Sequence, residues 1–248
     1  MKYTSKLILN WEEYQFAAPG SSYSWEPTAD TLLYLPLESD VVDQSWQATT
    51  RVFSTDSITY TTVDNVPSIH IWSTGWIKLT TPYPLVPNTD TYPCTVSVLV
   101  YTTDTNTDRF ILDMAASYWN RQAIWFHTAN DLWMSVYNDT NDSSYALLWA
   151  TPTLSQWNHI VYTITTTSSK LYVNWVLVDS WAGNPNYPRW NRPYGHDNIQ
   201  WIFCERDVWN YNIWLNWNAR ELIFEKKEWT EQEVANYYNW IKTQLWIN

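Results

Sequence analysis

Short runs of strand-forming residues recur along most of the chain, and clusters of turn-forming residues separate them. The runs are rich in Val, Ile, Thr, Tyr and Trp, whereas Asn, Asp, Ser and Pro fill the spaces between them. We predict strands over 32–37, 52–60, 68–72, 77–79, 96–101, 110–113, 124–127, 132–137, 145–149, 158–166, 170–174, 176–180, 199–204 and 221–225. Many short strands at this spacing are typical of an all-β sandwich.

One segment near the C-terminal end has helical periodicity instead. Thr230 and Glu233 form a Thr-x-x-Glu capping-box pattern, and Val234, Tyr237 and Ile241 follow at helical intervals. We predict a helix of about three turns that caps one edge or end of the sheets.

The charge balance and the hydropathy exclude two classes of partner. Of the 248 residues, 14 are Lys or Arg and 25 are Asp or Glu, which gives a formal net charge of −11. This sign is unfavourable for binding phosphate backbones or anionic lipid. No apolar run approaches the roughly 18 residues that span a bilayer, and the first ten residues have no secretory signal pattern. We therefore expect no nucleic-acid partner and no membrane insertion.

Turn-forming residues also suggest the domain organisation. The run from Lys6 to Phe16 has the pattern of a hairpin, and Ala18-Pro19-Gly20-Ser21-Ser22 follows it as a linker. We predict an N-terminal hairpin and linker over 1–25 and one domain over 26–248. The two cysteines, Cys94 and Cys204, form no metal-binding motif and are either two buried thiols or one bridge.

Four motifs occur in an order that is known from a family of β-sandwiches. They are Tyr34-Leu35-Pro36-Leu37-Glu38-Ser39-Asp40 with Asp43-Gln44-Ser45, Gln156-Trp157-Asn158-His159-Ile160-Val161, Leu171-Tyr172-Val173-Asn174, and Ala219-Arg220-Glu221-Leu222-Ile223-Phe224-Glu225 leading to Trp229. With them, residues 31–248 resemble the laminin-G-like branch of the concanavalin A-like lectin and glucanase superfamily. The stretch 233–242 resembles versions found in bacteriophage virion proteins and bacterial surface proteins. The resemblance implies a jelly-roll sandwich of two antiparallel sheets.

The glycine and tryptophan contents are unusual. Gly occurs 4 times, where average usage of about 7% would give roughly 17, and Trp occurs 20 times. The family hairpin reads Tyr-Val-Asn-Gly, whereas Trp175 follows Asn174 here, and a type I′ turn favours Gly at that place. We hypothesise a genetic code in which UGA means glycine, with some such codons read as Trp. The suspected positions are Trp11, Trp46, Trp76, Trp175, Trp217 and Trp246, and we expect turns at Asn10-Trp11, Asn174-Trp175 and Asn216-Trp217. A chain that truly prefers Trp is the alternative.

An acidic run is the one feature that suggests catalysis or a metal. Glu38, Asp40 and Asp43 approach the Glu-x-Asp-x-x-Glu strand with which glucanases of the superfamily place a nucleophile and an acid/base on one face. In the laminin-G-like pattern the same run lies in an exposed loop, where it is solvated or binds a cation. Asp40 and Asp43 are our candidate ligands for Ca²⁺. The place where Ca²⁺-binding family members carry an acidic residue holds Arg220, which argues against calcium.

Two loop regions gather side chains suited to sugars. Residues 183–198 hold three prolines and no strand period, so they form a long loop. Aromatic faces stack on sugar C–H faces, and arginine, asparagine and aspartate side chains bond to hydroxyl groups. The candidate carbohydrate-binding residues are Tyr118, Arg121, Tyr187, Arg189, Trp190, Arg192, Tyr194 and His196. The alternative is that the loop only packs its aromatic residues against the sandwich.

These observations predict a binding protein rather than an enzyme. We expect a non-catalytic carbohydrate-binding or adhesion module that recognises a glycan or cell-surface polysaccharide, located on a virion or cell surface, with other virion proteins as further partners. A structural virion or surface-layer module is one alternative. A glycoside hydrolase that uses Glu38 with Asp40 or Asp43 is another.

Overall fold

The computed structural model describes residues 23–45, 52–81, 93–103, 109–117, 120–127, 131–138, 143–165, 167–182, 200–202 and 217–245. Its elements are β1 (Thr31–Leu35), β2 (Val52–Val63), β3 (Val66–Thr81), β4 (Cys94–Thr102), β5 (Arg109–Ser117), β6 (Asn120–His127), β7 (Asp131–Asn138), β8 (Ser143–Ala150), β9 (Trp157–Ile164), β10 (Ser168–Val173), β11 (Val176–Ala182), β12 (Gln200–Ile202), β13 (Trp217–Glu225) and α1 (Glu231–Leu245). The mostly-β prediction is confirmed, and every predicted strand overlaps an observed one. The predicted strands 68–72 and 77–79 are parts of the single strand β3.

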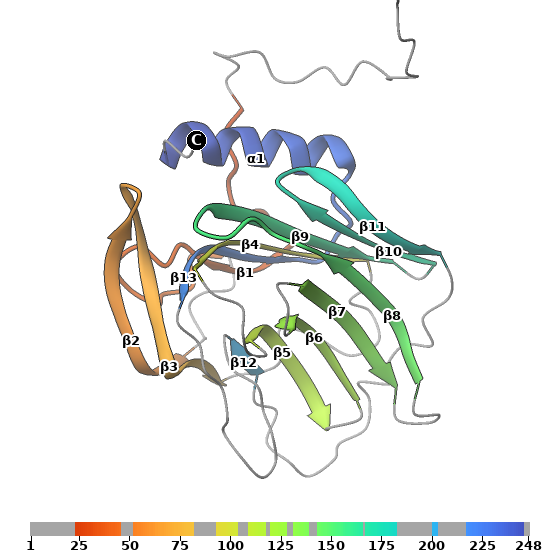
Figure 1. Ribbon diagram of the computed structural model, residues 1–248, viewed down its shortest axis with the longest axis horizontal. Helices are drawn as coiled ribbons and strands as arrows, with labels where there is room; N and C mark the ends of the chain where they lie inside the picture. The colour runs from red at the N-terminus through yellow and green to blue at the C-terminus, as the bar shows by residue number, and fades with distance from the viewer. Residues whose placement is uncertain are drawn as a thin grey trace, which may run out of the picture.

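The strands form a jelly-roll sandwich in which all pairings are antiparallel. The hydrogen-bonded order is β11-β10-β9-β4-β13-β3-β12-β5-β6-β7-β8, with β1 beside β13 and β2 beside β3. Strand β3 links the two layers, because Ile69–Ile71 pair with β13 and Ile77–Leu79 pair with β12. Figure 1 shows β4, β9, β10 and β13 in the layer below α1 and β5 to β8 in the next layer.

The central strands of the helix-side layer are buried on both faces. In β4, Val96, Val98 and Val100 point between the layers, and Leu99 points to the opposite face. Every residue of β9 is buried, and so is every residue of β4 except Tyr101. This layer therefore needs a cover on its outer side as well as a partner sheet.

Helix α1 supplies that cover. Val234, Tyr237 and Ile241 pack against Leu99 and Val161 on the outer face of the layer, and Figure 1 shows the helix lying across that face. The prediction that the helix caps an edge or end is therefore wrong, because the apolar outer face of β4 and β9 is the larger surface to bury. Within the part of the chain that the structure describes, no helix is long and apolar enough to cross a membrane.

The capping box at the start of α1 is confirmed. The backbone N–H of Glu233 donates to Thr230 Oγ1 over 3.2 Å, and the backbone N–H of Thr230 donates to Glu233 Oε2 over 2.8 Å. The helix has 15 residues, about four turns rather than three.

Two hairpins turn through paired residues in the left-handed region. Asp64 and Asn65 join β2 to β3 with φ values of 50° and 65°. Asn174 and Trp175 join β10 to β11 with φ values of 49° and 68°. The turn expected at Asn174-Trp175 is therefore confirmed, and a tryptophan occupies a conformation that favours glycine.

The other suspected tryptophans give a mixed result. Trp217 was expected in a turn, but it begins β13 and is buried between the layers, so that expectation is wrong. The backbone of Trp76 lies within β3. Trp11, Trp46 and Trp246 lie outside the described residues, as do the predicted N-terminal hairpin and Cys204. Cys94 is buried at the start of β4.

Candidate functional site

Most of the predicted carbohydrate-binding residues lie outside the described ranges. These are Tyr118, Tyr187, Arg189, Trp190, Arg192, Tyr194 and His196. Of the set, only the backbone of Arg121 is described, and it pairs with Ala115 between β6 and β5. The prediction of a sugar site in these loops therefore stays a prediction.

The acidic run follows β1 and contains no strand. Asp40 is exposed, whereas Asp43 is buried with 4% of its surface exposed. Asp43 Oδ1 accepts hydrogen bonds from the backbone N–H groups of Tyr34, over 3.0 Å, and Ser45, over 2.9 Å. This carboxylate folds the chain back against β1, so the strand that would place Glu38, Asp40 and Asp43 on one face is not formed.

No described residues form a group of three or more His, Cys, Asp or Glu side chains that could hold a metal ion. One oxygen of Asp43 is already occupied by two amide groups, and Asp40 is the exposed carboxylate of the pair. Calcium at Asp40 and Asp43 stays a prediction.

Glu38 is bound to an arginine rather than paired with a second carboxylate. Its Oε1 accepts a hydrogen bond from Arg220 Nη2. The same guanidinium donates to the carbonyl oxygen of Pro67 over 2.9 Å and lies 3.3 Å from Glu221 Oε1. Arg220 therefore links the loop after β1 to β13. From the sequence, this arginine was placed where Ca²⁺-binding family members carry an acidic residue.

Glu221 lies at a β-bulge in β13 and extends this network beneath α1. Its φ of 54° is in the left-handed region, and the register of β13 against β4 shifts between Arg220 and Ile223. The hydroxyl group of Tyr237 donates to Glu221 Oε2 over 3.5 Å. Burial raises the pKa of Glu221 to about 7, and the Arg220 charge opposes this shift. The protonation of Glu221 is therefore coupled to the packing of the helix.

His159 is also enclosed beneath the helix. Its ring is fully buried, its Nε2 lies 2.8 Å from Ser97 Oγ, and burial lowers its pKa to about 3. The ring lies against Tyr237 and Tyr238 of α1 at centroid distances of 5.4 and 6.0 Å. The serine–histidine contact is closed to any substrate, and we interpret it as structural.

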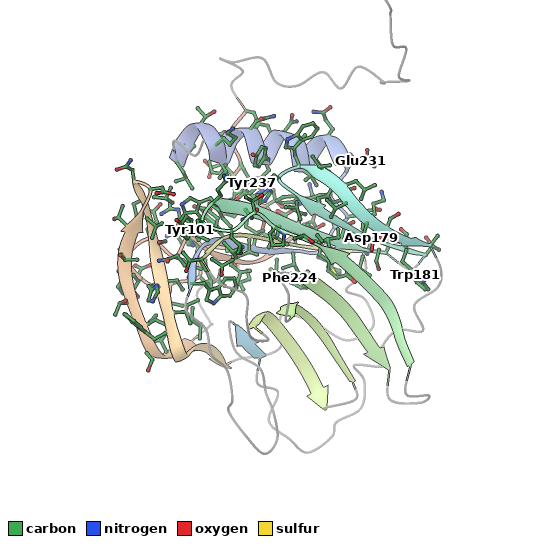
Figure 2. All side chains as sticks on the ribbon, in the orientation of Figure 1. Tyr101, Asp179, Trp181, Phe224, Glu231 and Tyr237 are labelled. Carbon is green, nitrogen blue, oxygen red and sulfur yellow. The ribbon has the colours of Figure 1, made fainter. Side chains whose placement is uncertain are left out.

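The same outer face continues past the helix as a row of aromatic and polar side chains. Backbone pairing aligns one residue from each of five strands: Trp157 of β9, Tyr101 of β4, Asn218 of β13, His70 of β3 and Thr59 of β2. Trp72 lies two residues beyond His70 on the same face. We call these six residues the outer-face row. Figure 2 places Tyr101 toward the β2–β3 hairpin and Tyr237 below the helix.

Side-chain contacts join the row in two groups, one of Trp157 and Tyr101 and one of the other four members. The rings of Trp157 and Tyr101 lie 5.6 Å apart. His70 Nδ1 lies 3.3 Å from Asn218 Oδ1, and Trp72 packs edge-on against His70 at a centroid distance of 4.4 Å. The Trp72 indole N–H donates to Thr59 Oγ1 over 3.2 Å.

The members of the row differ in exposure. Trp157 and Asn218 are buried, whereas Thr59 is exposed and Trp72 has 51% of its surface exposed. An oriented, exposed indole beside hydroxyl and imidazole groups can stack on a ring and form hydrogen bonds to it. We did not predict this site from the sequence. Its only sequence signal is the alternation Ile69-His70-Ile71-Trp72, in which the isoleucines face the core.

A family model matches the sequence over residues 73–202, and its description is the concanavalin A-like lectin/glucanases superfamily. No curated protein sequence matches the chain. The family match covers part of β3, all of β4 to β12 and the two loop regions predicted to bind sugar.

Solved structures of botulinum neurotoxin binding domains share the fold. One is the binding domain of botulinum neurotoxin DC in complex with rat synaptotagmin II, with a TM-score of 0.65 and 13% identity over 85% of this chain and 51% of that chain. Another is of botulinum neurotoxin type C, described as dependent upon two ganglioside molecules for entering cells, with a TM-score of 0.66, 13% identity and the same coverage. The chain therefore spans about half the length of these proteins, and the likeness is one of fold.

Proposed function

Because the chain belongs to the concanavalin A-like lectin and glucanase superfamily, we propose that it is a non-catalytic module that binds carbohydrate and mediates adhesion. The proposal rests chiefly on the observation that two carboxylates of the acidic run are bound within the fold. Glu38 is bound by Arg220 and Asp43 by two backbone amides, so the run forms part of the fold instead of a pair of carboxylates facing a substrate. Without that pair, the scaffold has the character of a lectin.

The fold likeness supports binding to a cell-surface receptor. One neurotoxin relative was solved with synaptotagmin II and another is described by its dependence on gangliosides. By analogy, we propose a cell-surface glycan as the ligand of this chain.

We further propose that the protein acts on a virion or cell surface, as a phage appendage or surface protein. The C-terminal pattern Glu233-Val234-Ala235-Asn236-Tyr237-Tyr238 that suggested this role forms the buried side of α1, where Val234 and Tyr237 are fully enclosed. Other virion proteins would then be further partners. A purely structural module would share this helix but bind no sugar.

The recoding of UGA as glycine is part of the same proposal. Trp175 at φ 68° supports it, since a turn of this kind favours glycine. Trp217 gives no such support, because its large side chain is enclosed in the core. The coding DNA tests the hypothesis: UGA at codon 175 supports it, and UGG there contradicts it.

A glycan-array screen of the whole protein, with and without Ca²⁺, tests the proposed function. We expect specific binding, and no release of sugar from the bound glycans over a day. Binding that requires Ca²⁺ would support a cation at Asp40 and Asp43. Absence of binding by a protein with a cooperative unfolding transition would favour the structural module. Cleavage that is lost in Glu38→Gln would establish the hydrolase.

A further inference from the structure

We propose that the outer-face row is a binding site for a neutral sugar ring, which stacks on Trp72 and accepts a hydrogen bond from Thr59. This inference rests on the proposed function and gives it a location. The location differs from the predicted loop sites and from the acidic run. It lies on the outer face of β2, β3 and β13, beyond the part that α1 covers.

The stacking surface is held in place before any ligand arrives. Trp72 is fixed by the hydrogen bond from its indole N–H to Thr59 Oγ1 and by its edge-on contact with the His70 ring. Two restraints on one side chain lower the entropy that binding would otherwise cost. About half of the Trp72 surface nevertheless remains exposed. An exposed indole in a fixed orientation is a surface on which the C–H groups of a sugar ring can pack.

The hydrogen-bonding roles in the row follow from Asn218. Its Nδ2 donates to Ser68 Oγ over 3.3 Å, so its Oδ1 is the atom that faces His70 Nδ1. His70 Nδ1 must then carry the proton, and in the neutral ring Nε2 is an acceptor. This Nε2 is buried and has no hydrogen-bond partner among the described residues. Because this nitrogen has no accessible surface, the role of His70 is to hold Trp72 in place rather than to contact the ligand.

Thr59 completes the set of polar groups. Its Oγ1 accepts the indole proton of Trp72 and retains its own proton for donation. Thr59 is exposed and pairs directly with His70 across β2 and β3. The row therefore offers an exposed indole with an exposed hydroxyl group beside it, and an oxygen of a sugar can accept the Thr59 proton.

The charges around the row favour a neutral ligand. None of its six members is a carboxylate, a lysine or an arginine. Arg220 lies two residues from Asn218 on the same strand, but it is buried and bound by Glu38 and Glu221. The net charge of −11 also repels acidic sugars. We therefore expect hexose-rich neutral glycans and weak binding of sialylated ones.

The test measures the affinity of the full chain for maltohexaose, cellohexaose, mannohexaose and a sialylated hexasaccharide by titration calorimetry. The variants are Trp72→Ala and Thr59→Val, with Tyr60→Ala as the matched control. Tyr60 lies on the same hairpin and is 48% exposed, but it pairs with Ile69 and so belongs to the opposite face. Thermal unfolding of each variant shows that the fold is retained.

We expect one neutral hexasaccharide to bind, with Kd raised about tenfold or more in Trp72→Ala, a few-fold in Thr59→Val and less than twofold in Tyr60→Ala. Equal affinity of Trp72→Ala and the wild type would overturn the site and leave the proposed function standing. Preference for the sialylated glycan would also overturn it. If the folded wild type binds none of the four and shows no array response, the site and the proposed function both fail.

Discussion

The outer face of the helix-side layer has two parts that share strands and differ in chemistry. Under α1, Leu99, Val161 and Ile223 meet Tyr237 and Ile241 in a closed apolar cluster. Beyond the helix, the outer-face row leaves Thr59 and Trp72 open.

The two parts differ in what their side chains leave exposed. Beneath the helix, Glu221 and Glu225 receive hydrogen bonds from Tyr237 and Thr31, respectively, within the fold. Both parts contain a buried histidine nitrogen without a hydrogen-bond partner among the described residues, so this feature does not distinguish them. The covered part uses its side chains to hold the helix, whereas the row keeps an oriented indole and a hydroxyl group exposed. We infer that the first part serves stability and the second serves binding.

The largest expected effect is on stability in the covered part. Ile241→Ala should lower the free energy of unfolding by about 3 kcal/mol, because it leaves a cavity beneath α1. Denaturant unfolding at constant temperature measures this value, and Ile241→Val should cost only about 1 kcal/mol. A loss below 1 kcal/mol for the alanine variant would mean that the helix is not needed to cover the sheet.

The second effect concerns pH and belongs to the covered part alone. The pKa of Glu221 is raised from its usual 4.5 to about 7 when folded, so the folded state binds more protons between these values. The Glu221 contribution is therefore complete below pH 4.5 and is lost as the pH rises through 7, with roughly 2 kcal/mol of the loss between pH 5 and pH 7. Urea unfolding at pH 5, 6 and 7 gives the free energy of unfolding as a function of pH. This free energy should fall more steeply with rising pH in the wild type than in Glu221→Gln. Parallel slopes would contradict the buried, protonated Glu221, and Trp72→Ala should keep the wild-type slope.

The third effect concerns backbone strain in two hairpin turns, the β10–β11 turn at Trp175 and the β2–β3 turn at Asn65. Trp175→Gly should raise the free energy of unfolding by about 1 kcal/mol, because glycine relieves the positive φ. Asn65→Gly in the β2–β3 turn should change it by only a few tenths, since asparagine already tolerates this conformation. Thermal and denaturant unfolding of both variants gives the comparison. A destabilised Trp175→Gly would show that the packing of Trp175 outweighs the backbone cost.

The smallest expected effect is on the stability of the outer-face row. Trp72→Ala should change the free energy of unfolding by less than about 0.5 kcal/mol, because half of the side chain is already in solvent. Denaturant unfolding beside Ile241→Ala makes the contrast direct. A loss above 2 kcal/mol would place Trp72 among the residues that hold the fold together.

The fold could be predicted from the sequence where local patterns decide it. Alternation in the strands, the Asn174-Trp175 turn and the Thr230–Glu233 capping box each depend on a few neighbouring residues. The position of α1 could not be predicted in that way, because it depends on how much apolar surface β4 and β9 expose once they are paired.

The proposed binding site in the outer-face row was harder to predict, because it too depends on how the strands pair. His70 and Trp72 lie in a predicted strand, but Asn218 is 148 positions from His70 and meets it only through the pairing of β3 with β13. From the sequence, Trp72 cannot be distinguished from a core aromatic residue. The spacing of the acidic run suggested a catalytic strand. In the structure, the Asp43 carboxylate is instead buried and accepts hydrogen bonds from the backbone N–H groups of Tyr34 and Ser45.

The most direct test of the two-part account is a map of sugar binding onto indole N–H resonances by NMR. Trp72→Phe assigns the exposed indole of the row, and Trp229→Phe assigns a buried indole beneath the helix. Titration with the neutral hexasaccharide that binds most tightly should shift the Trp72 resonance in proportion to occupancy and leave that of Trp229 unchanged. A saturable shift at other indoles, with the Trp72 resonance unmoved, would contradict the assignment of binding to the outer-face row.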